Sequence, residues 1–108
     1  MAEVVVTANF KRRYKPLAKR HRSLERDVLD LIGSLETNPI QGTALGKDCY
    51  KIRLAIRSKG SGKSGGARVI TYVRAMKHKV YLLAIYDKTD QASLSQKELA
   101  ELLNSLTG

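Results

Sequence analysis

The chain of 108 residues is poor in several residue types, and each shortage excludes a class of protein. Its one cysteine, Cys49, cannot form an internal disulfide, which excludes a disulfide-stapled secreted domain and favours a reducing cytoplasm. No apolar run reaches the roughly 18 residues of a membrane span, and no basic start precedes an apolar run as in a signal peptide. These absences predict a soluble, unexported, cytoplasmic protein with one domain, residues 1–108, and no membrane partner.

Aromatic and acidic residues are also scarce. With no Trp and one Phe, the core has to be built mainly of Leu, Val and Ile. Ten Asp and Glu oppose twenty Lys and Arg, and the net charge of +10 attracts polyanions, so the expected partner is a nucleic acid or an acidic protein. A merely soluble surface with a basic bias is the alternative, but such a surface usually mixes signs. Residues 49–86 contain nine Lys or Arg and no Asp or Glu, which favours binding of phosphates.

Hydrophobic periodicity predicts the order β-α-α-β-β-β-α, which is an α+β fold. The expected sheet has four strands and is mostly antiparallel, with an N-terminal helical hairpin and a C-terminal helix, all helices lying on one side. The expected strands are residues 3–8, 50–57, 67–73 and 79–86, and the expected helices are residues 10–20, 24–38 and 96–106.

Four local signals refine these elements. Pro16 either kinks the first helix or marks its start, since proline removes a helical hydrogen bond. Ser23 is placed to cap the second helix, which should end by Asn38-Pro39. The run Ser95-Gln96-Lys97-Glu98 is a capping box for the third helix, and residues 75–78 form a polar turn between strands.

The stretch RSKGSGKSGGARVITY contains Gly62-Lys63-Ser64, which fits the end of a phosphate-binding P-loop. However, Arg57 stands where that loop requires its first glycine, and Gly65-Gly66 leads into a strand rather than a helix. The sequence therefore argues against a nucleotide-hydrolysing site. Two interpretations of the stretch remain. It is either a flexible loop whose lysines, Lys59 and Lys63, bind along an RNA strand, or a long hairpin connection whose lysines only keep it soluble.

The strand motifs resemble a known family. KIRLAIRSKGSGKSGGARVITYV, VYLLAIYDK and LSQKELAEL follow one another as in the RelE superfamily of toxins from bacterial type II toxin–antitoxin systems, and resemble its HigB-like members most. The resemblance covers nearly the whole chain. It implies a RelE-like fold and an endoribonuclease that cuts mRNA in the ribosomal A site without a metal or other cofactor, and so inhibits translation. It also implies a cognate antitoxin that neutralises the toxin, and promoter DNA bound only through their complex.

RNA can be cut without metal when its 2′-OH attacks the adjacent phosphate, which needs a base, cations and an acid. Arg68, at the position of the family's strand arginine, is the first candidate for holding the phosphate, against the alternative of a pair with a sheet carboxylate. Lys88 matches the family's basic residue at the active-site rim, and Arg57 is a further catalytic candidate. Tyr86 either stacks on an RNA base or contributes its hydroxyl to the reaction, or else it packs against a helix. The residues expected to bind RNA or ribosome are Arg53, Lys51, Lys59, Lys63, Arg12 and Arg13.

The general base stays open. Some HigB-like toxins use a histidine near the C-terminus, whereas this chain has only His21 in the helical region and His78 in the predicted turn. Asp87 or Asp90 can serve as the base or orient another catalytic group, or else take a turn or capping role. A lysine of lowered pKa can also act as the base, or catalysis can be mainly electrostatic. The two histidines and Cys49 lack ligand-like spacing, so no metal site is expected. A non-catalytic module that binds RNA or ribosomes is the second hypothesis.

Overall fold

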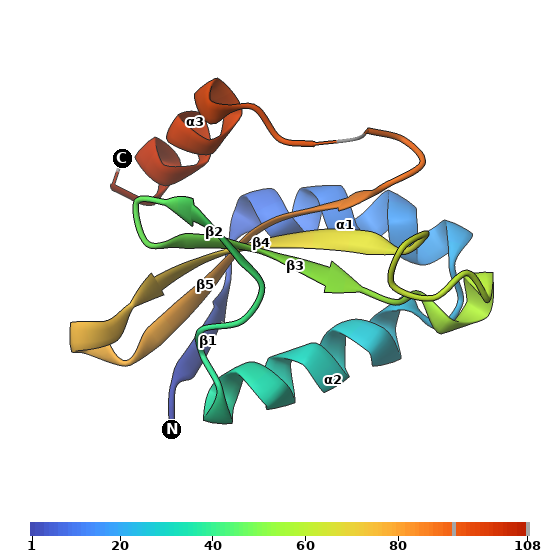
Figure 1. Cartoon of the computed structure of the whole chain (residues 1–108), viewed down its shortest axis with the longest axis horizontal. Helices are drawn as coiled ribbons and strands as arrows, with labels where there is room; N and C mark the ends of the chain where they lie inside the picture. The colour runs from blue at the N-terminus through green and yellow to red at the C-terminus, as the bar shows by residue number, and fades with distance from the viewer. Residues whose placement is uncertain (92, 108) are drawn as a thin grey trace.

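The computed structural model describes residues 1–91 and 93–107, in which a mixed sheet is covered by three helices (Figure 1). The sheet has five strands in the order β1-β5-β4-β3-β2, and β1 alone runs parallel to its neighbour. The strands are β1 (Glu3–Val6), β2 (Thr43–Gly46), β3 (Cys49–Leu54), β4 (Ala67–Arg74) and β5 (Lys79–Asp87). The helices are α1 (Ala8–Arg20), α2 (Leu24–Thr37) and α3 (Gln96–Thr107), with short 3₁₀ turns at Arg57–Lys59 and Ala75–Lys77.

The helices lie on both faces of the sheet, so the expectation that they share one side is wrong. Phe10 of α1 and Leu35 of α2 are buried against one face, together with Val69 and Ile85 of the central strands. Leu99 of α3 is buried in a second cluster on the other face. Figure 1 shows α2 and α3 on opposite sides of the sheet. The nearly all-apolar sequence of β5 follows from this arrangement, because both of its faces are covered.

The strand β2 is a further correction, since four strands were expected. It is short and largely exposed, and it pairs with β3 through a two-residue hairpin turn at Lys47 and Asp48. Both turn residues have positive φ, at 55° and 62°, as tight hairpins require. That conformation is usually signalled by an Asn-Gly or Asp-Gly pair, and Lys47-Asp48 is neither, so the turn carries no strong signal in the sequence.

The first helix begins at Ala8 and is continuous through Pro16, so the idea that it starts near the proline is wrong. The preceding strand ends at Val6 rather than residue 8, because Thr7 caps the helix: its Oγ1 accepts a hydrogen bond from Phe10 N–H at 3.2 Å. Pro16 is exposed, so the carbonyl that loses its helical partner can be hydrated.

Of the other predicted helix ends, the cap at Ser23 is wrong and two are confirmed. Ser23 precedes α2 but its side chain makes no capping hydrogen bond, whereas α2 ends at Thr37, before Asn38-Pro39, as predicted. The capping box of α3 is formed in both directions: Ser95 N–H donates to Glu98 Oε1 at 3.2 Å, and Glu98 N–H to Ser95 Oγ at 3.1 Å. Within the described part of the chain, no helix has the length and apolar character needed to cross a membrane.

Candidate nucleic-acid interface

Three of the predicted site residues form a row across the sheet. Arg53 of β3 lies opposite Arg68 of β4, and Arg68 lies opposite Tyr86 of β5. Directly opposed residues have Cβ atoms about 5 Å apart, and like charges at that spacing destabilise the sheet. The two arginines therefore favour an anion between or above them. We call Arg53, Arg68 and Tyr86 the cross-strand row.

The register of β5 places Tyr86 in this row. A bulge interrupts the pairing of β4 with β5: Ile70 lies opposite Ala84, while the next residue, Thr71, lies opposite Leu82. The extra residue, Leu83, shifts the alternation of β5, so Leu82 and Ile85 belong to the cluster with α1 and α2 while Ala84 and Tyr86 belong to the cluster with α3. The row therefore belongs to the face that α3 covers.

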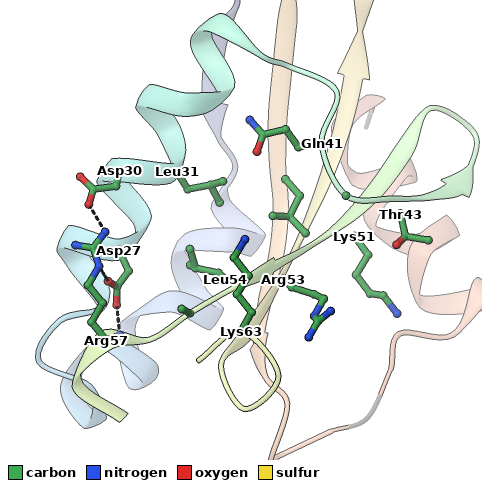
Figure 2. A pocket seen from close by; sticks show the side chains of 13 residues that line it. Asp27, Asp30, Leu31, Gln41, Thr43, Lys51, Arg53, Leu54, Arg57 and Lys63 are labelled. Atoms are coloured by element: carbon green, nitrogen blue, oxygen red, sulfur yellow. Dashed lines mark hydrogen bonds and ion pairs between the residues drawn. The ribbon is translucent and has the colours of Figure 1, made fainter. Parts of the chain in front are cut away.

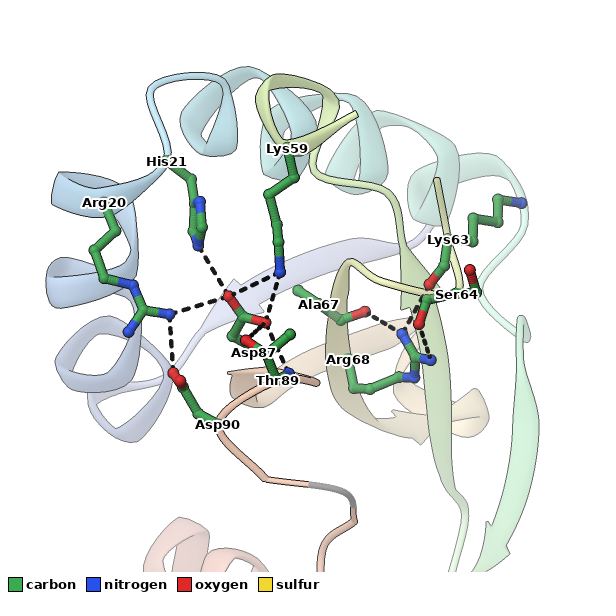
Figure 3. Close-up of polar contacts among 10 residues, drawn as sticks. All are labelled: Arg20, His21, Lys59, Lys63, Ser64, Ala67, Arg68, Asp87, Thr89 and Asp90. Carbon is green, nitrogen blue, oxygen red and sulfur yellow. Dashed lines mark hydrogen bonds and ion pairs between the residues drawn. The ribbon is translucent and has the colours of Figure 1, made fainter. Parts of the chain in front are cut away.

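Arg68 is buried, with 6% of its surface exposed, and its guanidinium holds the loop after β3 (Figure 3). Nη1 donates to the carbonyls of Lys63 at 2.9 Å and Ala67 at 3.1 Å, and Nη2 to that of Ser64 at 3.4 Å. Its partners are thus backbone carbonyls rather than the sheet carboxylate considered from the sequence. These contacts use three of the five N–H donors, and Nε–H has no partner among the described residues.

Tyr86 is buried at 4% exposure, and within the described chain its hydroxyl has no hydrogen-bond partner. Burial raises the pKa of the Tyr86 hydroxyl, against the opposing effect of the nearby Arg68 charge. The hydroxyl therefore stays protonated at neutral pH and can only act as a donor or a neutral acceptor.

Two further predicted cations, together with Arg53 of the row, lie around an open pocket at the edge of β3 (Figure 2). Lys51 and Arg53 extend from the strand, and Lys63 reaches the pocket from the glycine-rich loop. None of the three forms an ion pair with a residue that the structure describes. These side chains remain available for phosphates.

Arg57 lies outside the sheet, although the expected strand included residues 50–57. The strand β3 ends at Leu54, and Arg57 begins a 3₁₀ turn. Its Nη2 donates to Asp30 Oδ2 at 2.7 Å, its Nε lies 3.5 Å from Asp27 Oδ1, and its backbone N–H donates to Asp27 Oδ2 at 3.2 Å. The hydroxyl of Ser23 also donates to Asp27, instead of capping α2. Arg57 thus fastens the loop to α2.

The sequence did not reveal the buried carboxylate of Asp87 as a centre of charge. Arg20, His21 and Lys59 converge on it from α1 and the loop, at 3.0, 2.9 and 3.1 Å (Figure 3). Burial alone would raise the pKa of Asp87, but hydrogen bonds from Thr89, Lys59 and His21 outweigh it and hold the pKa well below its ordinary value. Asp87 also accepts from Thr89 N–H at 3.0 Å, so the predicted turn role is confirmed.

This cluster changes the view of Lys59, which the sequence placed free on a mobile loop. The position of Asp87 at the end of a buried strand was the only signal of this cluster in the sequence. The cations that bind Asp87 lie 28 to 67 residues away from it in the chain. Asp90 forms a second ion pair with Arg20 at 2.9 Å. We call Asp87 with Arg20, His21 and Lys59 the Asp87 cluster.

The remaining candidates are more dispersed. Lys88 is exposed just after β5, and its backbone N–H donates to the Gly66 carbonyl at 3.1 Å, which keeps it beside the loop. Arg12 and Arg13 lie on α1, which packs against the face opposite to the cross-strand row. The structure therefore does not bring those two together with the row. Cys49 is buried, and burial raises the pKa of its thiol to about 11.

The fold defines a class: an α+β fold that resembles those of solved E. coli toxin structures. The isolated E. coli RelE toxin matches with a TM-score of 0.58 at 18% identity, over 98% of this chain and 99% of that one. A free double mutant of E. coli RelE matches at 0.57 and 19% identity, covering 97% and 98%. The intact E. coli RelBE toxin–antitoxin complex matches at 0.54 and 18% identity, covering 81% and 96%.

A match to a sequence family identifies the protein family to which the chain belongs. Residues 4–106 match the family described as the RelE toxin of the RelE/RelB toxin–antitoxin system. The chain belongs to this RelE toxin family, which confirms the superfamily expected from the strand motifs. The closer likeness to HigB-like members stays a prediction.

Proposed function

We propose that this toxin is a metal-independent endoribonuclease that cuts translated mRNA in the ribosomal A site and so stops protein synthesis. The observation that carries the proposal is the pair Arg53 and Arg68, in register on adjacent strands. Two guanidinium groups at that spacing suit an RNA phosphate, whose non-bridging oxygens each accept charge-assisted hydrogen bonds.

The chemistry would be attack of the 2′-OH on the adjacent phosphorus, with its proton passing to water; the bond to the 5′-oxygen breaks and a 2′,3′-cyclic phosphate remains. Arg68 stabilises the extra negative charge of the pentavalent phosphorane, with Arg53 beside it. The protonated Tyr86 hydroxyl can donate to a phosphate oxygen, and Lys88, exposed just after β5, would protonate the leaving oxygen. The ribosome would hold the mRNA in line for attack.

The contacts of Arg68 add a requirement to this mechanism. Its guanidinium is covered by the carbonyls of Lys63 and Ser64, so the loop of residues 60–66 has to shift for the phosphate to reach it. The loop can move at Gly60 and Gly62, both of which have positive φ. Arg57 and Lys59, which are tied to α2 and to Asp87, fix the start of the loop and confine the movement to its tip.

The test is a translation reaction assembled from purified ribosomes and an end-labelled mRNA, with the mRNA ends mapped to single nucleotides. Cuts in the A-site codon that need the ribosome are expected from the wild-type protein. Arg68→Ala should cut about 10²- to 10³-fold more slowly. Arg74→Ala is the matched control, because Arg74 is an exposed arginine at the other end of β4. Cutting of free RNA at the same rate, or no cutting, would contradict the proposal.

A non-catalytic module that binds RNA or ribosomes is the second candidate. The observation that favours it is the engagement of Arg68 with its own loop, which leaves the open cations Lys51, Arg53 and Lys63 for binding alone. It predicts that the logarithm of RNA affinity falls with the logarithm of salt at about 0.7 per neutralised phosphate, with no cut products. Products in the translation reaction would exclude it.

We also propose that a cognate antitoxin neutralises the protein in the cytoplasm and that promoter DNA is bound only through their complex. The net charge of +10 favours an acidic partner, and the E. coli RelE neighbour is solved in complex with its antitoxin. Affinity purification from the source cells should recover a small acidic protein encoded beside this gene. Recovery of the toxin alone from cells that tolerate it would contradict a protein antitoxin.

A further inference from the structure

The pocket at the edge of β3 has a composition that the cleavage chemistry does not explain. It encloses about 480 Å³ between α2 and the strand, within the size range of small-ligand sites. Its lining carries two carboxylates, and both belong to the Arg57 ion pairs described above. Together with Arg57, the cations Lys51, Arg53 and Lys63 outnumber these carboxylates four to two, so the pocket is positive on balance and suits an anionic ligand.

The inner part of the pocket is apolar. Leu31 of α2 and Ile52 of β3 are buried there, and Leu54 and Ala55 continue the same wall. An apolar wall next to a group of cations fits a nucleotide, because the ring of the base is apolar on its face while the phosphate is charged. A free phosphate would use only the cations.

Gln41 supplies a polar group of fixed orientation. Its Nε2 donates to the carbonyl of Asn38 at 2.8 Å and to Ser34 Oγ at 2.9 Å. A carbonyl can only accept, so these bonds decide which end of the amide is nitrogen and leave Oε1 on the other side. Figure 2 shows this oxygen turned from the end of α2 toward the strand. The pocket therefore presents an acceptor to its ligand.

The geometry points to a subsite for one RNA nucleotide that flanks the scissile phosphate and whose base carries an exocyclic amino group. The phosphate lies among Lys63, Arg53 and Lys51, the base lies on the wall of Leu31 and Leu54, and the amino group donates to Gln41 Oε1. Arg53 belongs to both the pocket and the cross-strand row, so the two nucleotides are adjacent in the RNA. The inference rests on the proposed function, because that function makes RNA the ligand.

Cytidine and uridine 5′-monophosphates are the matched probes, because the amino group of cytosine is replaced by a carbonyl in uracil. We would titrate each, and inorganic phosphate, into ¹⁵N-labelled protein at low salt and follow amide chemical shifts. CMP should bind about three- to tenfold more tightly than UMP, the worth of one hydrogen bond. It should shift the side-chain amide of Gln41. Gln41→Leu should reduce the CMP:UMP ratio to about one, whereas Gln41→Glu, which keeps an acceptor oxygen, should retain the preference.

Equal binding of CMP and UMP by the wild type would overturn the inference, as would a preference that survives in Gln41→Leu. Phosphate that binds as tightly as CMP with the same shifts would reduce the pocket to an anion site and also overturn it. Binding of an acidic peptide such as hexaglutamate, with no binding of either nucleotide, would overturn it as well. These titrations contain no ribosome, so they succeed or fail independently of the cleavage assay, which tests the proposed function.

Discussion

Replacing Asp87 with Asn tests whether the buried charge of the Asp87 cluster stabilises the fold. Asparagine keeps the size of the side chain and can still accept from Thr89 N–H, but it removes the charge. Lys59 and His21, whose side chains are only 19% and 13% exposed, then lose their anion. Arg20 is half exposed and keeps Asp90, so it loses less.

The magnitude follows from this burial. Removing one partner of a buried ion pair costs about 3–5 kcal/mol, and the lower end applies because Lys59 can extend into water. We therefore expect Asp87→Asn to lower the free energy of unfolding by about 3 kcal/mol, and the midpoint of thermal unfolding by roughly 12–20 °C. Asp90→Asn is the matched control: Asp90 is 51% exposed, so its ion pair should contribute less than about 1 kcal/mol.

Urea unfolding of the three proteins between pH 3 and 7 measures the effect. The pKa of Asp87 is lowered in the folded protein, so its contribution is complete above the unfolded value of about 4. It is lost as the pH falls from there toward the lowered folded pKa. The difference between wild type and Asp87→Asn should therefore be constant from pH 5 to 7 and shrink below pH 4. Equal effects of the two substitutions, or a difference that grows in acid, would show that the buried charge of Asp87 does not stabilise the fold.

Three further predictions concern stability and reactivity. Gly66→Ala should lower the free energy of unfolding, measured in urea, by about 1–3 kcal/mol, because a methyl group there collides with a backbone carbonyl of β3. Gly33→Ala, in open space on α2, should raise it by up to about 1 kcal/mol. Effects of the same sign would contradict this pair of predictions. Ser95→Ala should cost about 1 kcal/mol through the capping box, and an unchanged urea midpoint would contradict it. Cys49 should react with a thiol reagent at pH 8 about 100-fold more slowly in the folded than in the unfolded protein, and equal rates would contradict its burial.

Long apolar patterns allowed the main elements to be predicted from the sequence. The alternation in β3 and the helical spacing in α2 each depend on burial of one face, so the pattern records the structure directly. The sides on which the helices lie were not predictable in this way. An apolar stripe shows that a helix is covered but not by which face of the sheet, and α3 was therefore placed wrongly.

The site was predicted only in part for a similar reason. Arg68 and Tyr86 were proposed from motifs and Arg53 from the alternation of its strand, but their common row depends on strand register, including the bulge at Leu83. The roles of Arg57 and Lys59 were missed because their partners, Asp30 and Asp87, come from distant segments. A basic residue looks the same in sequence whether it meets a phosphate or a carboxylate of its own chain.

The catalytic role of the cross-strand row is decided by the single-turnover rate of mRNA cleavage on ribosomes by wild type, Arg68→Ala and Arg74→Ala, with ribosome affinity measured for each. We predict that Arg68→Ala loses about 10²- to 10³-fold in rate with ribosome affinity within a few-fold of wild type, while Arg74→Ala cuts normally. An Arg68→Ala protein that cuts at the wild-type rate would contradict the assignment of the cross-strand row as the catalytic site.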